Sequence, residues 1–137
     1  MKTVFTFCII LISLSGCKKA IEKIQQDMVI KAMTDGQWAI TSFTEDGNNV
    51  LPTFAGYKFK YYDGPRKVDA TKNDVLENTG TWDGNSSSMT TSANFTNPSV
   101  PLGKINGEWH IDRSGWTYVE ATQVSNGVTK KMRLDKI

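Results

Sequence analysis

The amino-acid sequence predicts an all-β domain over residues 35–137: an antiparallel up-and-down barrel of about eight strands, preceded by a signal peptide and a short helix. Three observations lead to this prediction. Short segments of alternating apolar and polar residues are joined by tight turns rich in Gly, Asn and Asp. No helical pattern separates them, which disfavours a parallel α/β sheet. Twelve of the 14 aromatic residues lie in this domain, enough for a sizeable apolar core.

Residues 1–16 are predicted to be a signal peptide. After Lys2, residues 4–14 form an apolar run of 11 residues, shorter than the roughly 20 that a membrane-spanning helix needs. The tetrapeptide Leu14-Ser-Gly-Cys17 follows, and it resembles the lipobox of bacterial lipoproteins at all four positions. That resemblance implies cleavage before Cys17 and lipid on its thiol. The alternative is an ordinary secretory signal followed by a chance cysteine.

The loss of residues 1–16 would change both the thiol inventory and the charge of the chain. Cys8 would be discarded and Cys17 acylated, which leaves no thiol for a disulfide, a metal site or a nucleophile. Loss of Lys2 leaves 15 Lys and Arg against 14 Asp and Glu. That near-neutral balance argues against nucleic acid as a partner.

Residues 17–34 are predicted to be the lipidated N-terminus and a helical tether. Ile21, Ile24, Met28 and Ala32 fall on one helical stripe. The stripe can dock on the barrel as a lid, lie on the membrane surface, or belong to a simple amphipathic tether, which we favour. Surface-exported lipoproteins of Bacteroidetes-like bacteria usually carry acidic residues after the lipidated Cys. The basic residues 18–19 depart from that pattern and favour an outer-membrane protein that faces the periplasm.

The strands of the barrel are predicted from alternation and turn residues. Tyr57, Phe59 and Tyr61 share one face of the clearest strand, and Met132 and Leu134 point inward from the last one. Residues 94–103, with two prolines, are predicted to be irregular. The eight predicted strands are residues 38–43, 56–62, 67–71, 80–82, 88–93, 107–112, 116–121 and 130–136.

A Gly-x-Trp pattern occurs three times, at residues 36–38, 80–82 and 107–109. Each glycine is expected to let the backbone turn before a strand, and each tryptophan to begin a packed face. Gly36-Gln37-Trp38 looks like the signature of lipocalins, in which a basic residue of the last strand packs across the tryptophan. The resemblance implies that role for Arg133, with Lys131 as second choice, so that Gly36, Trp38 and Arg133 close the barrel.

A more specific resemblance rests on the order of several short motifs along the chain. The lipobox, residues 36–38, 54–59, 80–82, 101–102, 106–109 and 134–136 together resemble a family of small lipocalin-like lipoproteins of Bacteroidetes. That resemblance implies a lipid-anchored barrel in the cell envelope.

Catalytic chemistry is not expected from this sequence. The single histidine, His110, alternates with two apolar residues and is expected to face solvent. The hairpin carboxylates Asp83, Glu108 and Asp112 are expected to be solvated rather than paired for acid–base work. No calcium loop, phosphate-binding loop or nucleophile elbow is found. We expect a non-enzyme with no catalytic residue, metal or cofactor.

Aromatic residues of the domain are the remaining candidates for a site. They can line a ligand cavity, or they can be the core itself, because an eight-stranded barrel is just wide enough for either. Their number favours a largely filled interior. Two functions stay open: a binding module for a small apolar or amphipathic molecule, and an envelope interaction protein that presents residues 94–103. The ligand-binding candidates are Tyr57, Phe59, Tyr61, Trp82, Trp109 and Tyr118.

Overall fold

The computed structural model describes residues 13–137, with side chains from residue 18 onward. Helix α1 precedes the barrel, the 3₁₀ helix η1 follows β2, and helix α2 lies between β6 and β7. The elements are α1 (Ser13–Thr34), β1 (Trp38–Glu45), β2 (Asn48–Asn49), η1 (Leu51–Phe54), β3 (Tyr57–Tyr61), β4 (Lys67–Lys72), β5 (Val75–Asn85), β6 (Thr90–Asn94), α2 (Val100–Ile105), β7 (Gly107–Ser114), β8 (Tyr118–Ser125) and β9 (Val128–Lys136).

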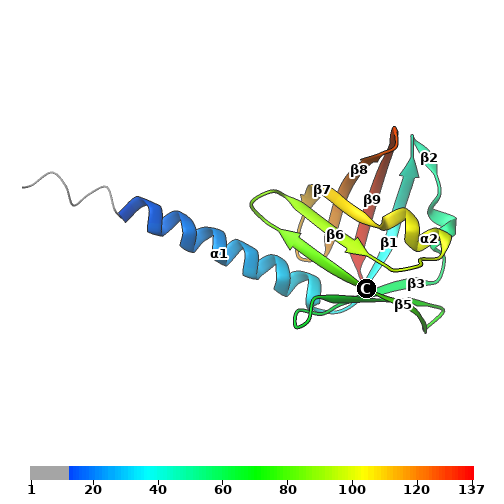
Figure 1. The fold of residues 1–137 in the computed structure, drawn as a ribbon, viewed down its shortest axis with the longest axis horizontal. Coiled ribbons are helices and arrows are strands. Elements are labelled where there is room, and N and C mark those ends of the chain that lie inside the picture. Colours follow the sequence, from blue (N-terminus) through cyan, green and yellow to red (C-terminus); the bar gives the residue numbers. More distant parts are fainter. Residues whose placement is uncertain (1–12) are drawn as a thin grey trace, which may run out of the picture.

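The strands close into one antiparallel barrel. Sequential neighbours from β3 to β9 pair in order, β1 pairs with β3 at Trp38↔Phe59, and β9 returns to pair with β1 from Lys136 to Lys130. The two-residue β2 only extends β1 at its far end. Figure 1 shows the closed ring of strands between α1 on one side and α2 on the other. The predicted up-and-down barrel of eight strands, here β1 and β3–β9, is confirmed.

The end of the barrel nearer α2 is plugged by side chains. Phe54 of η1 and Leu102 and Ile105 of α2 are buried. We predicted that residues 94–103 are irregular, and this is wrong for residues 100–103, which are helical. A helix begins at Val100, and Pro101 fits its first turn, where the missing N–H would have no partner in any case.

Strand β5 is much longer than its predicted core at residues 80–82. It begins at Val75 because Asn73 and Asp74 both adopt positive φ, 51° and 63°, and form a tight hairpin after β4. Asn and Asp tolerate this left-handed conformation better than most residues, and two such residues in succession suit a two-residue hairpin.

Two of the three Gly-x-Trp glycines behave as predicted. Gly36 adopts a φ of +77° shortly before β1, and Gly107 adopts a φ of +97° as the first residue of β7. Gly80 instead lies inside β5, and a Cβ there would sit 2.4 Å from the carbonyl oxygen of Asn94. Its role is close approach of two strands rather than a turn.

Helix α1 is docked on the barrel over its C-terminal half. Met33 is buried in the core, and Ile30 packs against it. The Gln26 side chain donates to the Gly84 carbonyl at 2.5 Å and accepts from the Ser86 amide at 2.9 Å. This half is thus more than the simple tether that we favoured.

Farther toward the N-terminus of α1, Ile21 and Ile24 are exposed to solvent. None of the described helices is both long and apolar enough to cross a membrane. The predicted signal peptide lies mostly outside the described residues, and lipid on Cys17 stays a prediction.

Candidate ligand cavity

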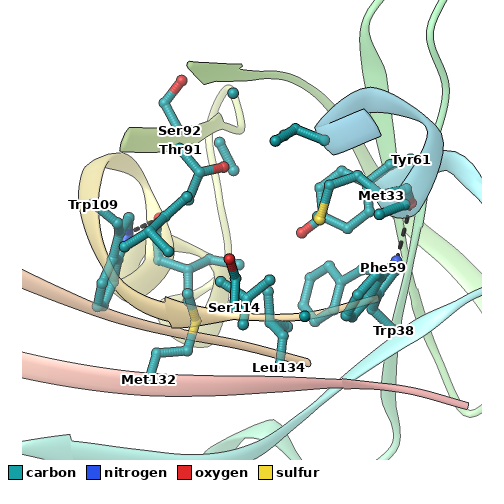
Figure 2. Close-up of a pocket in the computed structure, with 18 of the residues that line it drawn as sticks. Met33, Trp38, Phe59, Tyr61, Thr91, Ser92, Trp109, Ser114, Met132 and Leu134 are labelled. Carbon is teal, nitrogen blue, oxygen red and sulfur yellow. Dashed lines mark hydrogen bonds between the residues drawn. The ribbon is translucent and has the colours of Figure 1, made fainter. Parts of the chain in front are cut away.

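A cavity of about 280 Å³ lies inside the barrel, between the docked part of α1 and the plug formed by α2. Figure 2 shows Trp109 on one side of this space and Tyr61, Met33 and Trp38 on the other. Its deep walls are Trp38, Ile40, Phe59, Trp109, Met132 and Leu134.

The interior is therefore not filled, contrary to the expectation that we favoured. Small residues of β5 and β6 account for the space. Thr91 and Ala93 pair with Gly84 and Trp82 and share the inward face with Trp109. A glycine, an alanine and a threonine there leave room opposite the large residues of β1, β3 and β9. The small residues of β5 and β6 thus create the cavity.

The cavity is apolar and uncharged. No Asp, Glu, Lys, Arg or His is among its lining residues. Its hydroxyl-bearing residues are Tyr61, Thr91, Ser92 and Ser114. An apolar lining with a few polar groups is typical of small-molecule sites, because burial of apolar surface supplies affinity and the polar groups supply orientation.

The rim of the cavity is also apolar, with side chains from α1 and from the turn between β7 and β8. Met28 and Trp116 line the cavity and are still 47% and 50% exposed. Ala32, from the same predicted helical stripe as Met28, lines it as well. Of the four residues in that stripe, Met28 and Ala32 therefore lie over the cavity, as the lid interpretation expects.

The two buried indoles among the lining residues, Trp38 and Trp109, use their N–H groups within the protein. Trp38 Nε1 donates to the carbonyl of Met33 at 2.9 Å, and Trp109 Nε1 donates to the carbonyl of Ile105 at 2.9 Å (Figure 2). These bonds tie Trp38 to α1 and Trp109 to α2. The walls of the cavity are thus fixed at both ends, and neither indole N–H is left for a ligand.

Tyr61 differs from these indoles because its hydroxyl has no hydrogen-bond partner among the described residues. Its side chain is only 6% exposed, and burial raises the pKa of the phenol well above its ordinary value. In the described part of the chain, every side-chain oxygen that is sealed from solvent has a hydrogen-bond partner. The Tyr61 hydroxyl therefore has access to the cavity that its residue lines.

Three of the six ligand-binding candidates line the cavity: Phe59, Tyr61 and Trp109. Tyr57 is buried but lies outside the lining, and its hydroxyl donates to Glu77 at 2.7 Å and lies 3.3 Å from Ser99. The Tyr57 pKa is raised, chiefly by burial.

Trp82 is also buried outside the lining. Its ring meets Tyr61 edge-on at 5.4 Å, and the Arg66 guanidinium lies 5.6 Å from its centroid. It supports the wall behind Tyr61.

Tyr118 does not face the cavity. Its ring lies 4.7 Å from the guanidinium carbon of Arg133. In β8 the buried residues are Val119 and Ala121, so Tyr118 belongs to the opposite, outer face. The sequence alone does not fix which of the two alternating sets in this strand points inward.

The implied closure of Trp38 by Arg133 is wrong. Met132 and Leu134 are buried, so alternation places Arg133 and Lys131 on the outer face of β9. The cation over Trp38 belongs to Lys136, whose Nζ lies 5.2 Å from the ring. Lys136 has the same parity along β9 as Met132 and Leu134, so it shares their face of the strand.

Arg133 instead organises an outer network. It donates to Asp135 at 2.8 and 2.9 Å and to Glu120 at 2.8 Å. The bond from Arg133 lowers the pKa of the Asp135 carboxyl. The network joins β8 and β9 away from the cavity.

The remaining predicted polar residues also lie outside the cavity. His110 faces outward, as expected, and its Nδ1 lies 3.3 Å from Asp112. Asp83 pairs with Arg66 on the surface, and Glu108 is exposed. These groups and the cavity do not share a site.

The fold and the cavity define a closed antiparallel β-barrel with an apolar interior space. No family model matches the sequence, and no curated protein matches it. Among solved structures, the crystal structure of a DUF4847 family protein from Bacteroides vulgatus is similar. That likeness covers 78% of this chain and 96% of that chain, with a TM-score of 0.54 and 13% sequence identity. At this identity the likeness shows the fold alone.

Proposed function

We propose that this protein is a lipid-anchored, lipocalin-like binding protein of the cell envelope that holds a small apolar or amphipathic molecule and catalyses no reaction. The observation that carries the proposal is the uncharged cavity of about 280 Å³ inside the barrel. That volume is close to the lower end of the range for ligand sites, about 300–1,000 Å³. Apolar area removed from water contributes about 25 cal/mol per Å², which favours an apolar occupant.

The position of α1 supports an exchange of ligand with a membrane. Between Cys17 and Met28 the helix rises about 16 Å, at 1.5 Å per residue. Met28 lies on the rim of the cavity. A lipid on Cys17 would therefore hold the cavity rim within a short distance of the bilayer, in which apolar ligands dissolve. The basic residues 18–19 favour the periplasmic side of the outer membrane.

Quenching of tryptophan fluorescence by bromodecane tests the binding function. The full-length chain is placed in phosphatidylcholine vesicles with Trp116→Phe as background, because the exposed Trp116 can meet quencher dissolved in the lipid. Trp38 and Trp109 line the cavity, so bound bromodecane should quench them.

The matched control fills the cavity. Ala93 lines the cavity and is only partly buried, so Ala93→Phe places a ring in that space. Thr91→Leu is a second and smaller filler at the same face. Both variants should lose most of the quenching while keeping the circular dichroism of the parent. Equal quenching in the parent and in both folded variants would refute binding inside the barrel.

An interaction protein is the second candidate, and one surface favours it. Val75, Leu76 and Val100 are exposed at the end of the barrel that α2 plugs. Leu76 adjoins Glu77, whose carboxylate accepts a hydrogen bond from Ser99 beside Val100. Exposed apolar patches often mark interaction sites. Photo-crosslinking from position 100 in intact cells should yield a discrete adduct under this hypothesis, and no adduct would count against it.

A further inference from the structure

We infer that the cavity selects a neutral amphiphile whose head group accepts a hydrogen bond from the Tyr61 hydroxyl while its chain points toward Trp109. This inference rests on the proposed binding function and specifies the ligand class and its orientation.

Tyr61 is the group best placed to recognise a polar head. Its phenol is nine-tenths buried, it lines the cavity, and its hydroxyl bonds to no described residue. Because this hydroxyl reaches the cavity without a protein acceptor, a ligand oxygen can accept its hydrogen bond with no protein bond to break. The raised pKa of Tyr61 keeps the phenol protonated and therefore a donor.

The other polar groups of the cavity are less available. The two buried lining indoles, Trp38 and Trp109, already donate to backbone carbonyls, and the third, Trp116, is half exposed at the rim. The Thr91 hydroxyl donates to the Asp83 carbonyl at 3.0 Å. Ser92 is on the outer face of β6, where its neighbours in the strand register are Asp83 of β5 and Glu108 of β7. Ser114 is exposed near the rim. The buried hydrogen-bond donor left for a ligand is thus the Tyr61 hydroxyl.

The two sides of the cavity differ in chemistry, which sets the orientation. Tyr61 ends β3 near α1, whereas Trp109 lies near α2 with Ile105 beside it. Figure 2 shows Tyr61 and Trp109 on opposite sides of the space. The Trp109 side presents indole and aliphatic surface, and its Thr91 hydroxyl already donates to Asp83, so this side suits an alkyl chain. The Tyr61 side presents the donor, which suits the head.

The absence of charge in the lining excludes an ionised head as the preferred one. No lining residue is charged. An ion taken into such a site without a counter-charge loses its hydration with no compensation. The ligand class is therefore a neutral molecule with a hydroxyl, carbonyl or ester oxygen and a short apolar chain.

The test measures displacement of bromodecane by decanol, decane and decanoate, with the full-length Trp116→Phe chain in vesicles. Tyr61→Phe should weaken decanol about three- to tenfold, the value of one hydrogen bond, and leave decane unchanged. Tyr57→Phe is the matched control, because it removes a hydroxyl from the same strand that does not line the cavity. It should change neither affinity. Each ratio compares one ligand in the same vesicles, so partition into lipid cancels.

The charge arm uses decanoate at pH 8, corrected for its partition into protein-free vesicles. It should compete at least about tenfold less well than decanol, since its carboxylate would be desolvated. Decanoate that competes equally well overturns the neutral head. Unchanged decanol affinity in Tyr61→Phe overturns the role of Tyr61 while the binding function stands. If bromodecane fails to bind at all, the proposed function fails first.

Discussion

Replacement of Leu102 by alanine should destabilise the barrel strongly, because this buried side chain plugs the end of the barrel near α2. Leu102 is fully buried in a six-residue helix that contributes only one other buried side chain, Ile105. Leu-to-Ala changes at buried sites cost about 2–5 kcal/mol, and the larger values belong to sites that cannot collapse. A closed ring of strands surrounds this site, so we expect about 3–4 kcal/mol. For a domain of this size that corresponds to a fall in Tm of more than about 10 °C.

Urea unfolding followed by tryptophan fluorescence measures this change, with Val100→Ala as the matched control on the same helix. Val100 is 76% exposed, so its truncation should cost less than about 0.5 kcal/mol. Bromodecane binding should weaken in Leu102→Ala at temperatures where it stays folded, because water gains access beside Ile105 and Trp109. A loss below about 1 kcal/mol for Leu102→Ala, similar to that of the control, would refute the plug.

Three further predictions follow from particular contacts. Cys17→Ala, or globomycin, should leave an unprocessed or soluble chain on membrane fractionation, and unchanged partitioning would refute lipidation. The hydrogen bond from Arg133 lowers the pKa of Asp135 in the folded protein. The ionised carboxylate therefore stabilises the fold above about pH 4, the pKa in the unfolded chain. This contribution is lost as the pH falls through the lower pKa of the folded protein. Arg133→Met should therefore flatten the acid limb of the stability profile, and an unchanged limb would contradict this assignment. Tyr57→Phe should lower the free energy of unfolding by about 1 kcal/mol, whereas Tyr61→Phe should be near neutral because its hydroxyl has no protein partner. Equal losses in chemical denaturation would contradict that difference.

The sequence was sufficient to predict the barrel because its strands alternate clearly. Tyr57, Phe59 and Tyr61 are all buried, as are Met132 and Leu134. The same rule of parity, applied one step further along β9, would have placed Lys136 rather than Arg133 over Trp38. That error came from the family resemblance, which names a residue type and a strand but not a face.

The cavity itself could not be predicted from the aromatic residues. A count of large side chains measures how much volume is available to fill a barrel, but an unfilled space depends on where small residues face one another. Gly84, Thr91 and Ala93 come from two strands, and the shared inward face of the latter two with Trp82 and Trp109 is known only from the β5–β6 and β6–β7 registers. A slip of one residue would turn Thr91 and Ala93 outward and close the space.

The three Gly-x-Trp tryptophans explain how the barrel keeps its cavity open. Each indole N–H donates to a backbone carbonyl: Trp38 to Met33, Trp82 to Tyr62 and Trp109 to Ile105. An indole held at its polar edge cannot turn into an adjacent space without loss of a buried hydrogen bond, which costs about 1–3 kcal/mol. Three tryptophans in a small barrel thus do more than occupy volume. Because Trp38 and Trp109 are fixed as walls, the small residues of β6 can leave a permanent space between them.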